Sequence, residues 1–302
     1  MEFRTQLFGF GPDLGNGGSK IGHHRCPYAP IPIPCTNKPA VTSNSHPLPP
    51  SKVPAMTPQT PRTPRTPRTP QQLLERARRL AASGDRRLLG IAGPPGAGKT
   101  TLAEYLVGGL GPGQAVLVPM DGFHLADTEL RRLGLTGRKG APETFDPYGY
   151  TALLRRLRAA RQGEPVYAPG FDRELEQPIA GSIPVPPEVP LVVTEGNYLL
   201  LDDGPWAEAR KLLDESWWVE LDDDERVRRL IARHERFGKE AAEAERFVLD
   251  SDEANARRVA PGRAAADLVI TFGPGQAPRP GQAPRPDEAP TPGATPRTGQ
   301  GK

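Results

Sequence analysis

The 302-residue chain has little of what disulfide-rich, membrane-spanning or strongly charged proteins need. It has only two cysteines, no apolar run near the ~18–20 residues of a membrane helix, and no charged-then-apolar start typical of a signal peptide. Its net charge of +3 is small for this length and forms no single basic face that the sequence can show. We therefore expect a cytoplasmic protein that binds neither nucleic acid nor membrane.

The two cysteines, Cys26 and Cys35, lie near His23, His24 and His46, so a metal site has to be considered. Their spacing matches no common zinc pattern, and the surrounding residues are rich in proline without periodic apolar positions. Reduced thiols in an unstructured segment are the favoured interpretation, and a metal role is the alternative.

Proline is concentrated at the two ends, because 23 of the 38 prolines lie in residues 1–70 and 273–302. These ends contain the repeats TPRTPRTPRTP and GQAPRPGQAPRP, which favour extended chain over helix. We expect disordered tails over 1–70 and 274–302, acting as linkers or docking on an aromatic groove. The intervening residues 71–273 are long enough for one domain with one core.

Strand and helix patterns alternate along this central part. Short apolar runs predict strands, and apolar residues at helical spacing predict helices. The expected strands are Arg86–Gly93, Ala115–Met120, Pro190–Gly196, Ser216–Asp222 and Ala266–Phe272, and the expected helices are Gln71–Ser83, Leu102–Leu110, Tyr150–Gly163 and Asp224–Gly238. The alternation predicts an α/β fold with a parallel sheet, whose ligands bind at the carboxyl ends of the strands.

The run GPPGAGKTT follows the first expected strand and precedes a helix, and it fits G-x-x-x-x-G-K-[ST] in full. Backbone N–H groups of such a loop cradle phosphates, its lysine neutralises the β and γ phosphates, and its hydroxyl binds Mg²⁺. The lysine is Lys99 and the metal-binding hydroxyl is that of Thr100. The predicted nucleotide-binding residues are Gly93, Pro94, Pro95, Gly96, Ala97, Gly98, Lys99, Thr100 and Thr101.

The residue after the second expected strand separates the classes of P-loop protein. The one Asn-Lys pair, Asn37-Lys38, continues as Pro-Ala, so the N-K-x-D segment of a GTPase is missing. Asp121, in PMDGFHLAD, directly follows the strand, where a carboxylate can take a proton from a hydroxyl. A plain Asp-Gly turn is the alternative.

Several segments together resemble the nucleoside/nucleotide kinase family, in the group of phosphoribulokinase, uridine kinase and pantothenate kinase. They are GPPGAGKTT, DGFHL, RKGAPETFD, VYAPGFDRELEQP, VTEGNYLLL, RLIARHERFG and SDEANARRV, and they span about Leu88 to Ile270. The resemblance implies a P-loop kinase with a five-stranded parallel sheet, a movable lid and ATP as phosphoryl donor. It implies a small-molecule hydroxyl acceptor and allows a homodimer.

Two acidic residues gain roles from the resemblance. It makes Asp121 the carboxylate on the acceptor side and the expected base. Glu195, at the end of LVVTEG, becomes the acidic residue that holds Mg²⁺ directly or through water. From the residues alone, Glu195 could instead cap the loop before Asn197.

Two polar segments are expected near the acceptor. Arg138 and Lys139 lie in TGRKGAPETFD and could bind acceptor or phosphate anions, with a solvated surface loop as the alternative. Asp172 and Arg173 lie in APGFDRELEQP, where a salt-bridged turn is the alternative.

The last segments concern a lid. Arg229, Arg233 and Arg236 recur at spacings of four and three, so they share one helical face. A solvated basic face is the ordinary interpretation, whereas the resemblance places a lid here and favours Arg233 as the arginine that reaches the ATP phosphates. Asn255 would line the nucleotide or acceptor pocket, or lie on a helix surface.

The sequence therefore predicts an ATP- and Mg²⁺-dependent kinase that phosphorylates a hydroxyl of a small metabolite, foremost a nucleoside or related compound. Pantothenate or a sugar such as fructose is the alternative acceptor. A P-loop ATPase that switches partner binding through its tails is the alternative function.

Overall fold

The structure is a computed structural model that describes residues 68–159, 163–272, 275–279 and 281. Cys26, Cys35, the neighbouring histidines and nearly all of the expected tail residues lie outside this part, so those expectations stay predictions. Among the helices of the described residues, none is long and apolar enough to cross a bilayer.

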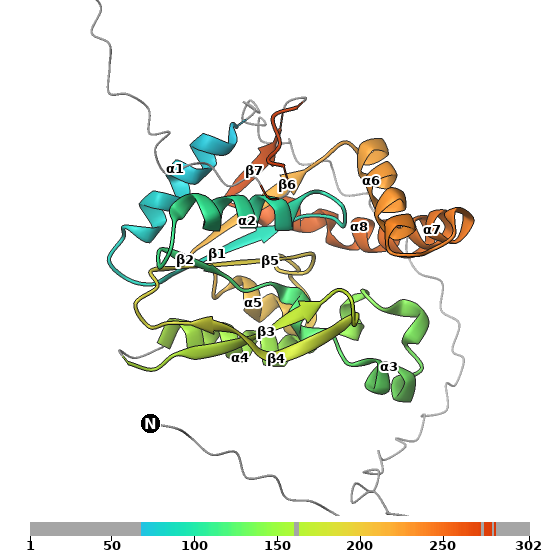
Figure 1. The fold of residues 1–302 in the computed structure, drawn as a ribbon, viewed down its shortest axis with the longest axis horizontal. Coiled ribbons are helices and arrows are strands. Elements are labelled where there is room, and N and C mark those ends of the chain that lie inside the picture. The colour runs from blue at the N-terminus through green and yellow to red at the C-terminus, as the bar shows by residue number, and fades with distance from the viewer. Residues whose placement is uncertain (1–67, 160–162, 273–274, 280, 282–302) are drawn as a thin grey trace, which may run out of the picture. The chain divides into compact units, whose positions relative to one another are not determined.

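The centre of the fold is a five-stranded sheet in which every neighbouring pair runs parallel (Figure 1). This confirms the predicted α/β class and the number of strands. In spatial order the strands are β2 (Ala115–Leu117), β5 (Leu191–Gly196), β1 (Arg87–Ala92), β6 (Glu215–Glu220) and β7 (Leu268–Thr271). The phosphate-loop strand β1 thus lies in the middle, between β5 and β6.

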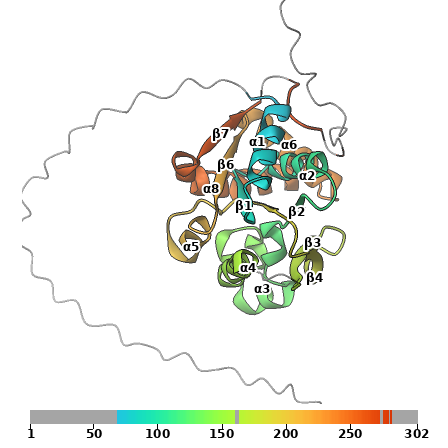
Figure 2. The ribbon, with the colours of Figure 1, turned by 90° about the vertical axis from the view of Figure 1, so that its left-hand side faces the viewer.

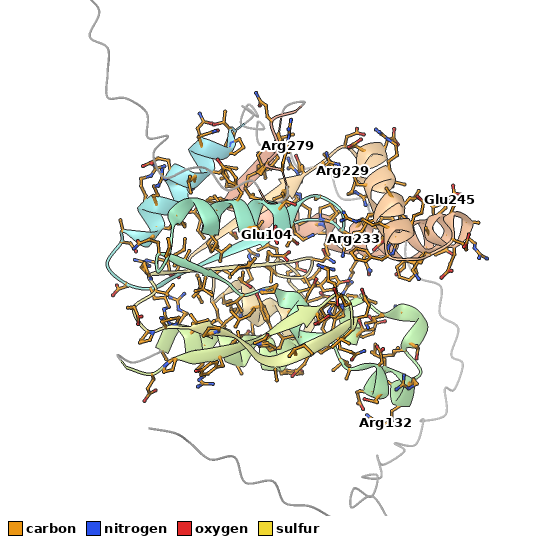
Figure 3. The ribbon with its side chains drawn as sticks, viewed as in Figure 1. Glu104, Arg132, Arg229, Arg233, Glu245 and Arg279 are labelled. Carbon is orange, nitrogen blue, oxygen red and sulfur yellow. The ribbon has the colours of Figure 1, made fainter. Side chains whose placement is uncertain are left out.

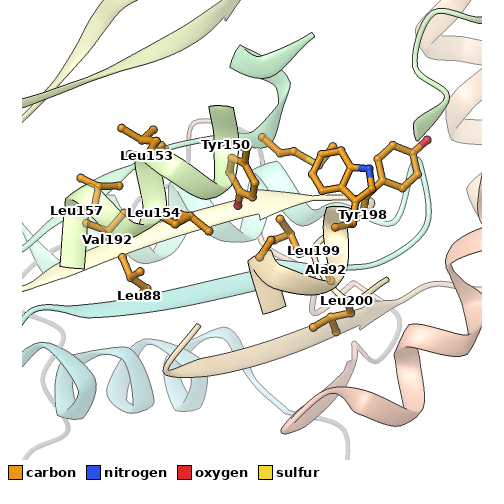
Figure 4. Close-up of a cluster of buried hydrophobic side chains, with 14 of the residues drawn as sticks. Leu88, Ala92, Tyr150, Leu153, Leu154, Leu157, Val192, Tyr198, Leu199 and Leu200 are labelled. Carbon is orange, nitrogen blue, oxygen red and sulfur yellow. The ribbon is translucent and has the colours of Figure 1, made fainter. Parts of the chain in front are cut away.

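Both faces of the sheet are covered, which is why its strands are apolar on both sides. Alternate residues of β1 enter opposite cores: Leu88 and Ala92 one, Leu89 and Ile91 the other. Helices α1 (Pro70–Ala81) and α2 (Lys99–Leu110) cover the second face, and α4 (Pro147–Ala159) covers the first (Figure 1, Figure 2). Leu153, Leu154 and Leu157 of α4 pack with Leu88 and Val192 in this first core (Figure 4).

Helix α1 begins at a local signal. Thr69 accepts a hydrogen bond from the Gln72 backbone N–H, and the Gln72 side chain accepts one from the Thr69 N–H. This reciprocal capping box satisfies two backbone donors, and Pro70 suits the first helical position. Leu73, Leu74 and Ala77 are buried against the sheet, so the expected helix Gln71–Ser83 is confirmed with shifted ends.

The second strand is shorter than expected. The sequence predicts a strand over Ala115–Met120, but β2 ends at Leu117 and a 3₁₀ turn occupies Met120–Phe123. Val118 still donates its N–H to Val193 in β5, after which Pro119 has no N–H to continue the pairing. The chain therefore turns at Pro119 and brings Asp121 into the 3₁₀ turn.

Two elements below the sheet were not predicted. The hairpin of β3 (Val166–Asp172) and β4 (Gln177–Val185) is antiparallel and contains several prolines, which obscured its strand pattern. Helix α3 (Asp127–Leu133) is too short for a clear apolar period. Both lie on the side of the sheet that carries α4 (Figure 1, Figure 2).

The C-terminal part of the domain is helical up to the last strand. Helix α6 (Asp223–Arg236) is followed by α7 (Ala241–Phe247), a π-helical turn (Val248–Asp252) and α8 (Glu253–Val259). The short α5 (Ala207–Arg210) precedes β6. Helix α6 packs against the phosphate loop at Gly96, and α7 follows it at the same end of the sheet (Figure 1).

Candidate active site

The phosphate loop connects β1 to α2 over Gly93–Gly98. Gly96 and Gly98 have φ values of 78° and 94°, where an L side chain is strained. A Cβ on Gly96 would lie 2.7 Å from the Leu230 side chain, so the loop can pack against α6 only with glycine there. The loop thus turns tightly and presents the N-terminus of α2, a favourable place for phosphate.

Lys99, the first residue of α2, is buried rather than projecting into solvent. Its ammonium donates to the Pro94 carbonyl at 2.9 Å and to the Asn197 side-chain oxygen at 2.7 Å. Desolvation lowers the pKa of Lys99 to about 8, against the opposing effect of the Glu195 and Asp121 charges. An ammonium has three donors, so one donor of Lys99 remains for a phosphate oxygen.

Thr100 and Glu195 meet beside Lys99. The Thr100 hydroxyl donates to the Glu195 carboxylate at 3.0 Å, because Glu195 lies opposite Ile91 in the β1–β5 register. Burial, and then the charge of Asp121, raises the pKa of Glu195 to about 7. A hydroxyl and a carboxylate at a phosphate loop are the hard oxygen donors that suit Mg²⁺.

This donor set fits magnesium better than a fully protein-ligated metal. No group of three or more His, Cys, Asp or Glu side chains in the described residues could hold a metal ion. Mg²⁺ usually takes one or two protein oxygens and completes its shell with phosphates and water. Thr100 and Glu195 are therefore the residues that would hold it.

Asp121 lies in the 3₁₀ turn that follows β2, the edge strand paired with β5. Its carboxylate is partly exposed and forms an ion pair with Arg173 of the hairpin turn at 3.5 Å. The next residue, Gly122, packs so closely on the hairpin that a Cβ would lie 2.3 Å from the Pro169 carbonyl. The Asp-Gly pair is thus a turn held against the hairpin, and the same turn aims Asp121 toward Lys99 and Glu195, whose pKa values its charge affects.

Arg233 extends from α6 toward the same cluster (Figure 3). Its side chain is exposed, and partial desolvation followed by the charge of Arg173 lowers its pKa. The charges of Asp121 and Glu195 act on it in the opposite direction. Arg233 therefore lies on α6, the helix that packs against the phosphate loop at Gly96.

The predicted residues Arg138 and Lys139 lie in the segment between α3 and α4. Arg138 pairs with Glu143 at 2.6 Å and is largely exposed. Lys139 pairs with Asp127 at 2.9 Å, so it ties its loop to α3. These two side chains thus have protein partners and are not gathered at Lys99.

Asp172 and Asn255 also have local partners. The Asp172 carboxylate accepts the backbone N–H groups of Glu174 and Leu175, each at 2.9 Å, and so shapes the hairpin turn. Asn255 is buried and its amide donates to the Gly140 carbonyl at 3.4 Å. It lines a cavity of about 400 Å³ between the Gly137–Ala141 loop and the helices α7 and α8.

Sequence reasoning missed two features of the site. Asn197 contacts Lys99 directly, and its place two residues after Glu195 at a strand end was the signal that could have found it. His234, next to Arg233, bonds Asp252 of the π-helical turn at 3.0 Å and so ties α6 to that turn. No short-range pattern joins His234 to Asp252, so this pair was visible only in the structure.

Comparisons with known proteins agree with this geometry. No family model matches the chain. It is 35% identical over 209 residues to a Schizosaccharomyces pombe protein named "Putative uridine kinase C227.14", covering 66% of this chain and 88% of that protein. The chain belongs to the P-loop kinases of the uridine kinase, pantothenate kinase and phosphoribulokinase group.

Two further relatives show how much of this P-loop kinase is shared. The Aspergillus versicolor "ATP-dependent kinase-like protein notR'" is 34% identical over 159 residues, half of this chain and 92% of that protein. A crystal structure of a "putative fructose transport system kinase" from Silicibacter sp. TM1040 is 35% identical, covers 68% of this chain and all of that one, and superposes with a TM-score of 0.61. The names of these relatives differ in acceptor, so membership of the P-loop kinases does not fix the acceptor of this one.

Proposed function

We propose that this P-loop kinase transfers the γ-phosphoryl group of ATP to a hydroxyl of a small metabolite, with a nucleoside as the first candidate acceptor. The observation that carries the proposal is the position of Asp121. It brings a partly exposed carboxylate from β2 to a phosphate loop on β1, although β5 lies between the two strands. A nucleotide switch has no need of a base at that place.

The residues divide the reaction between them. The oxygen of the acceptor hydroxyl forms a bond to the γ-phosphorus while Asp121 accepts the proton of that hydroxyl. The bond between the γ-phosphorus and the β,γ-bridging oxygen breaks, and ADP leaves. Lys99 and the α2 N-terminus bind the phosphates, and Arg233 offsets charge on the transferred group from the opposite side. Bound Mg²⁺, held by Thr100 and Glu195, supplies charge neutralisation of the phosphate oxygens.

The proposal assigns five further residues to the acceptor side, with different closeness to Asp121. They are Arg138, Lys139, Asp172, Arg173 and Asn255. Arg173 is paired with Asp121 and so limits how the carboxylate points. Asn255 lines the cavity of about 400 Å³ beside the Gly137–Ala141 loop, a volume within the range of small-molecule sites. The remaining three shape the loops and hairpin around it.

Acceptor-dependent release of ADP tests the proposal. The full chain is assayed with Mg·ATP and separate panels of nucleosides, sugars and pantothenate, and the product is identified by mass spectrometry. A phosphorylated nucleoside as product supports the proposal as stated. A phosphorylated sugar or phosphorylated pantothenate supports the kinase reaction but identifies that compound, not a nucleoside, as the acceptor. ATP hydrolysis that no acceptor stimulates would favour the ATPase switch, and light scattering of the same sample tests whether it is a homodimer.

A further inference from the structure

Lys99 is connected to the acceptor side through two consecutive residues, Asn197 and Tyr198. Its ammonium donates to the Asn197 side-chain oxygen, and the next residue, Tyr198, donates its hydroxyl to the Gly140 carbonyl. Gly140 belongs to the loop between α3 and α4 that carries Arg138 and Lys139. Two consecutive residues after β5 therefore link the phosphate loop to the acceptor loop.

Each of these two bonds has a matched donor and acceptor. The Asn197 side-chain oxygen accepts from the Lys99 ammonium, and the Tyr198 hydroxyl donates its hydrogen to the Gly140 carbonyl. The peptide bond between Asn197 and Tyr198 joins the two contacts.

Burial makes these bonds consequential. Tyr198 and Lys99 are buried, and Asn197 is half-buried. Inside a protein an unpaired polar group is costly, so the loss of one member leaves its neighbour unsatisfied. Tyr198 also packs edge-on against Phe145 and beside Trp206, which fixes its ring under the loop.

We propose that Asn197 is a positioning residue that orients Lys99 for phosphate and, through Tyr198, couples it to the acceptor loop at Gly140. The inference deepens the proposed kinase function and rests on it where it concerns the acceptor. Acceptor binding that shifts or orders this loop changes the hold on Lys99, and by linkage ATP binding changes acceptor affinity by the same factor.

The first experiment needs no acceptor. Binding of a non-hydrolysable ATP analogue with Mg²⁺ is measured by calorimetry for the wild type and Asn197→Leu, which has a similar size but no polar group. We expect about tenfold weaker binding, because a hydrogen bond to a charged group is lost. Analogue affinity equal to that of the wild type would overturn the role of Asn197. Asn197→Ser is the second variant if the leucine variant does not fold.

The second experiment measures the coupling. Analogue affinity is determined with and without the acceptor found by the screen, for the wild type, Tyr198→Phe and the exposed control Tyr148→Phe. We expect a coupling factor of about five or more in the wild type and in Tyr148→Phe, and a factor near one in Tyr198→Phe. Undiminished coupling in Tyr198→Phe, or none in the wild type, would refute the link.

The two experiments separate the failures. If no acceptor stimulates ADP release, the kinase proposal fails, and calorimetry with Asn197→Leu still decides whether Asn197 positions Lys99. If an acceptor is phosphorylated and Tyr198→Phe raises its KM while leaving kcat nearly unchanged, the link acts on acceptor binding. A purely structural Tyr198 would lower thermal stability without changing the coupling factor.

Discussion

The Thr100 hydroxyl lies 3.0 Å from the Glu195 carboxylate, although 95 residues separate them in the chain. The pairing of β1 with β5 brings them together, because it aligns the end of the phosphate-loop strand with the end of β5. The same alignment buries Glu195, and this burial, followed by the charge of Asp121, raises the pKa of the carboxyl to about 7.

Glu195 is therefore expected to make the nucleotide-free protein sensitive to pH. Its folded pKa of about 7 lies above the ordinary 4.5, so its contribution to stability is fully present below pH 4.5 and is lost as pH rises through 7. Relative to Glu195→Gln, the wild-type free energy of unfolding should fall on the order of 1 kcal/mol or more between pH 5 and 8. Urea denaturation at several pH values measures this difference.

The same titration predicts proton release on loading. If Glu195 holds Mg²⁺, binding of Mg·nucleotide at pH 6.5 should release protons, and Glu195→Gln should release fewer. Calorimetry in buffers of different ionisation enthalpy measures the number of protons. Equal release by both proteins would remove Glu195 from the metal site.

Asp121→Asn keeps the shape of the side chain and removes its charge. We expect kcat with the acceptor to fall by about 10²–10⁴-fold, since a general base contributes on that scale, while affinity for an ATP analogue changes little. Steady-state kinetics and calorimetry measure the two quantities. Near-normal turnover would show that Asp121 serves only the Asp-Gly turn and is not a base. A loss of ATP affinity as large as the loss of kcat would show that Asp121 instead helps to bind Mg²⁺.

Lys99→Met tests a buried cation in the catalytic role. We expect kcat to fall by about 10²-fold or more, because a charged donor to the transferred phosphate is lost. The variant should stay folded, since methionine fills the space and removes a desolvated charge. Circular dichroism and thermal melting provide the check, and an unfolded variant would make Lys99 structural.

Arg233→Lys keeps a positive charge on α6 but removes the planar guanidinium. If Arg233 contacts the transferred group, kcat should fall by about tenfold or more while thermal stability stays unchanged, because the side chain is exposed. Arg228→Lys, also exposed on α6, is the matched control. Equal kinetics for both variants would show that Arg233 belongs to a solvated basic face of α6 and has no role in phosphoryl transfer.

The effect of an N-terminal truncation on stability should depend on whether Thr69 is kept. Removal of residues 1–67 should leave the melting temperature and kcat nearly unchanged, whereas removal of residues 1–70 should destabilise the protein by about 0.5–2 kcal/mol. The difference is the capping box at Thr69, which the longer deletion removes together with Pro70. Melting both truncated proteins side by side measures it, and a large loss with the shorter deletion would show that the removed segment docks on the core.

Local patterns predicted most of the sheet and the phosphate loop. Each strand of the sheet is a short apolar run, and the loop motif fixes its own backbone through glycine and the helix that follows. The hairpin was missed because prolines such as Pro169 and Pro178 conceal alternation in strands that lie outside the sheet. Local residue preferences could not show that the Asp-Gly turn at Asp121 packs against this hairpin.

The sequence predicted the residues of the candidate site that follow strands, but not the hydrogen bonds that join its side chains. Asp121 and Glu195 follow apolar runs, so the sequence alone places both at the carboxyl edge of a parallel sheet. The bonds from Lys99 to Asn197 and from His234 to Asp252 join side chains whose contact depends on strand order and helix packing. Those depend on the whole core rather than on any window of sequence.

The strand order also has a consequence for synthesis of the chain. β1 and β2 are made early, but the strand between them, β5, begins only at Leu191. A nascent chain that ends before Leu191 has its phosphate-loop sequence and Asp121 but neither Glu195 nor the strand that aligns them. Nucleotide capture by ribosome-bound chains of increasing length should therefore begin abruptly, after β5 has left the exit tunnel, because non-local pairing must come before the pocket can exist.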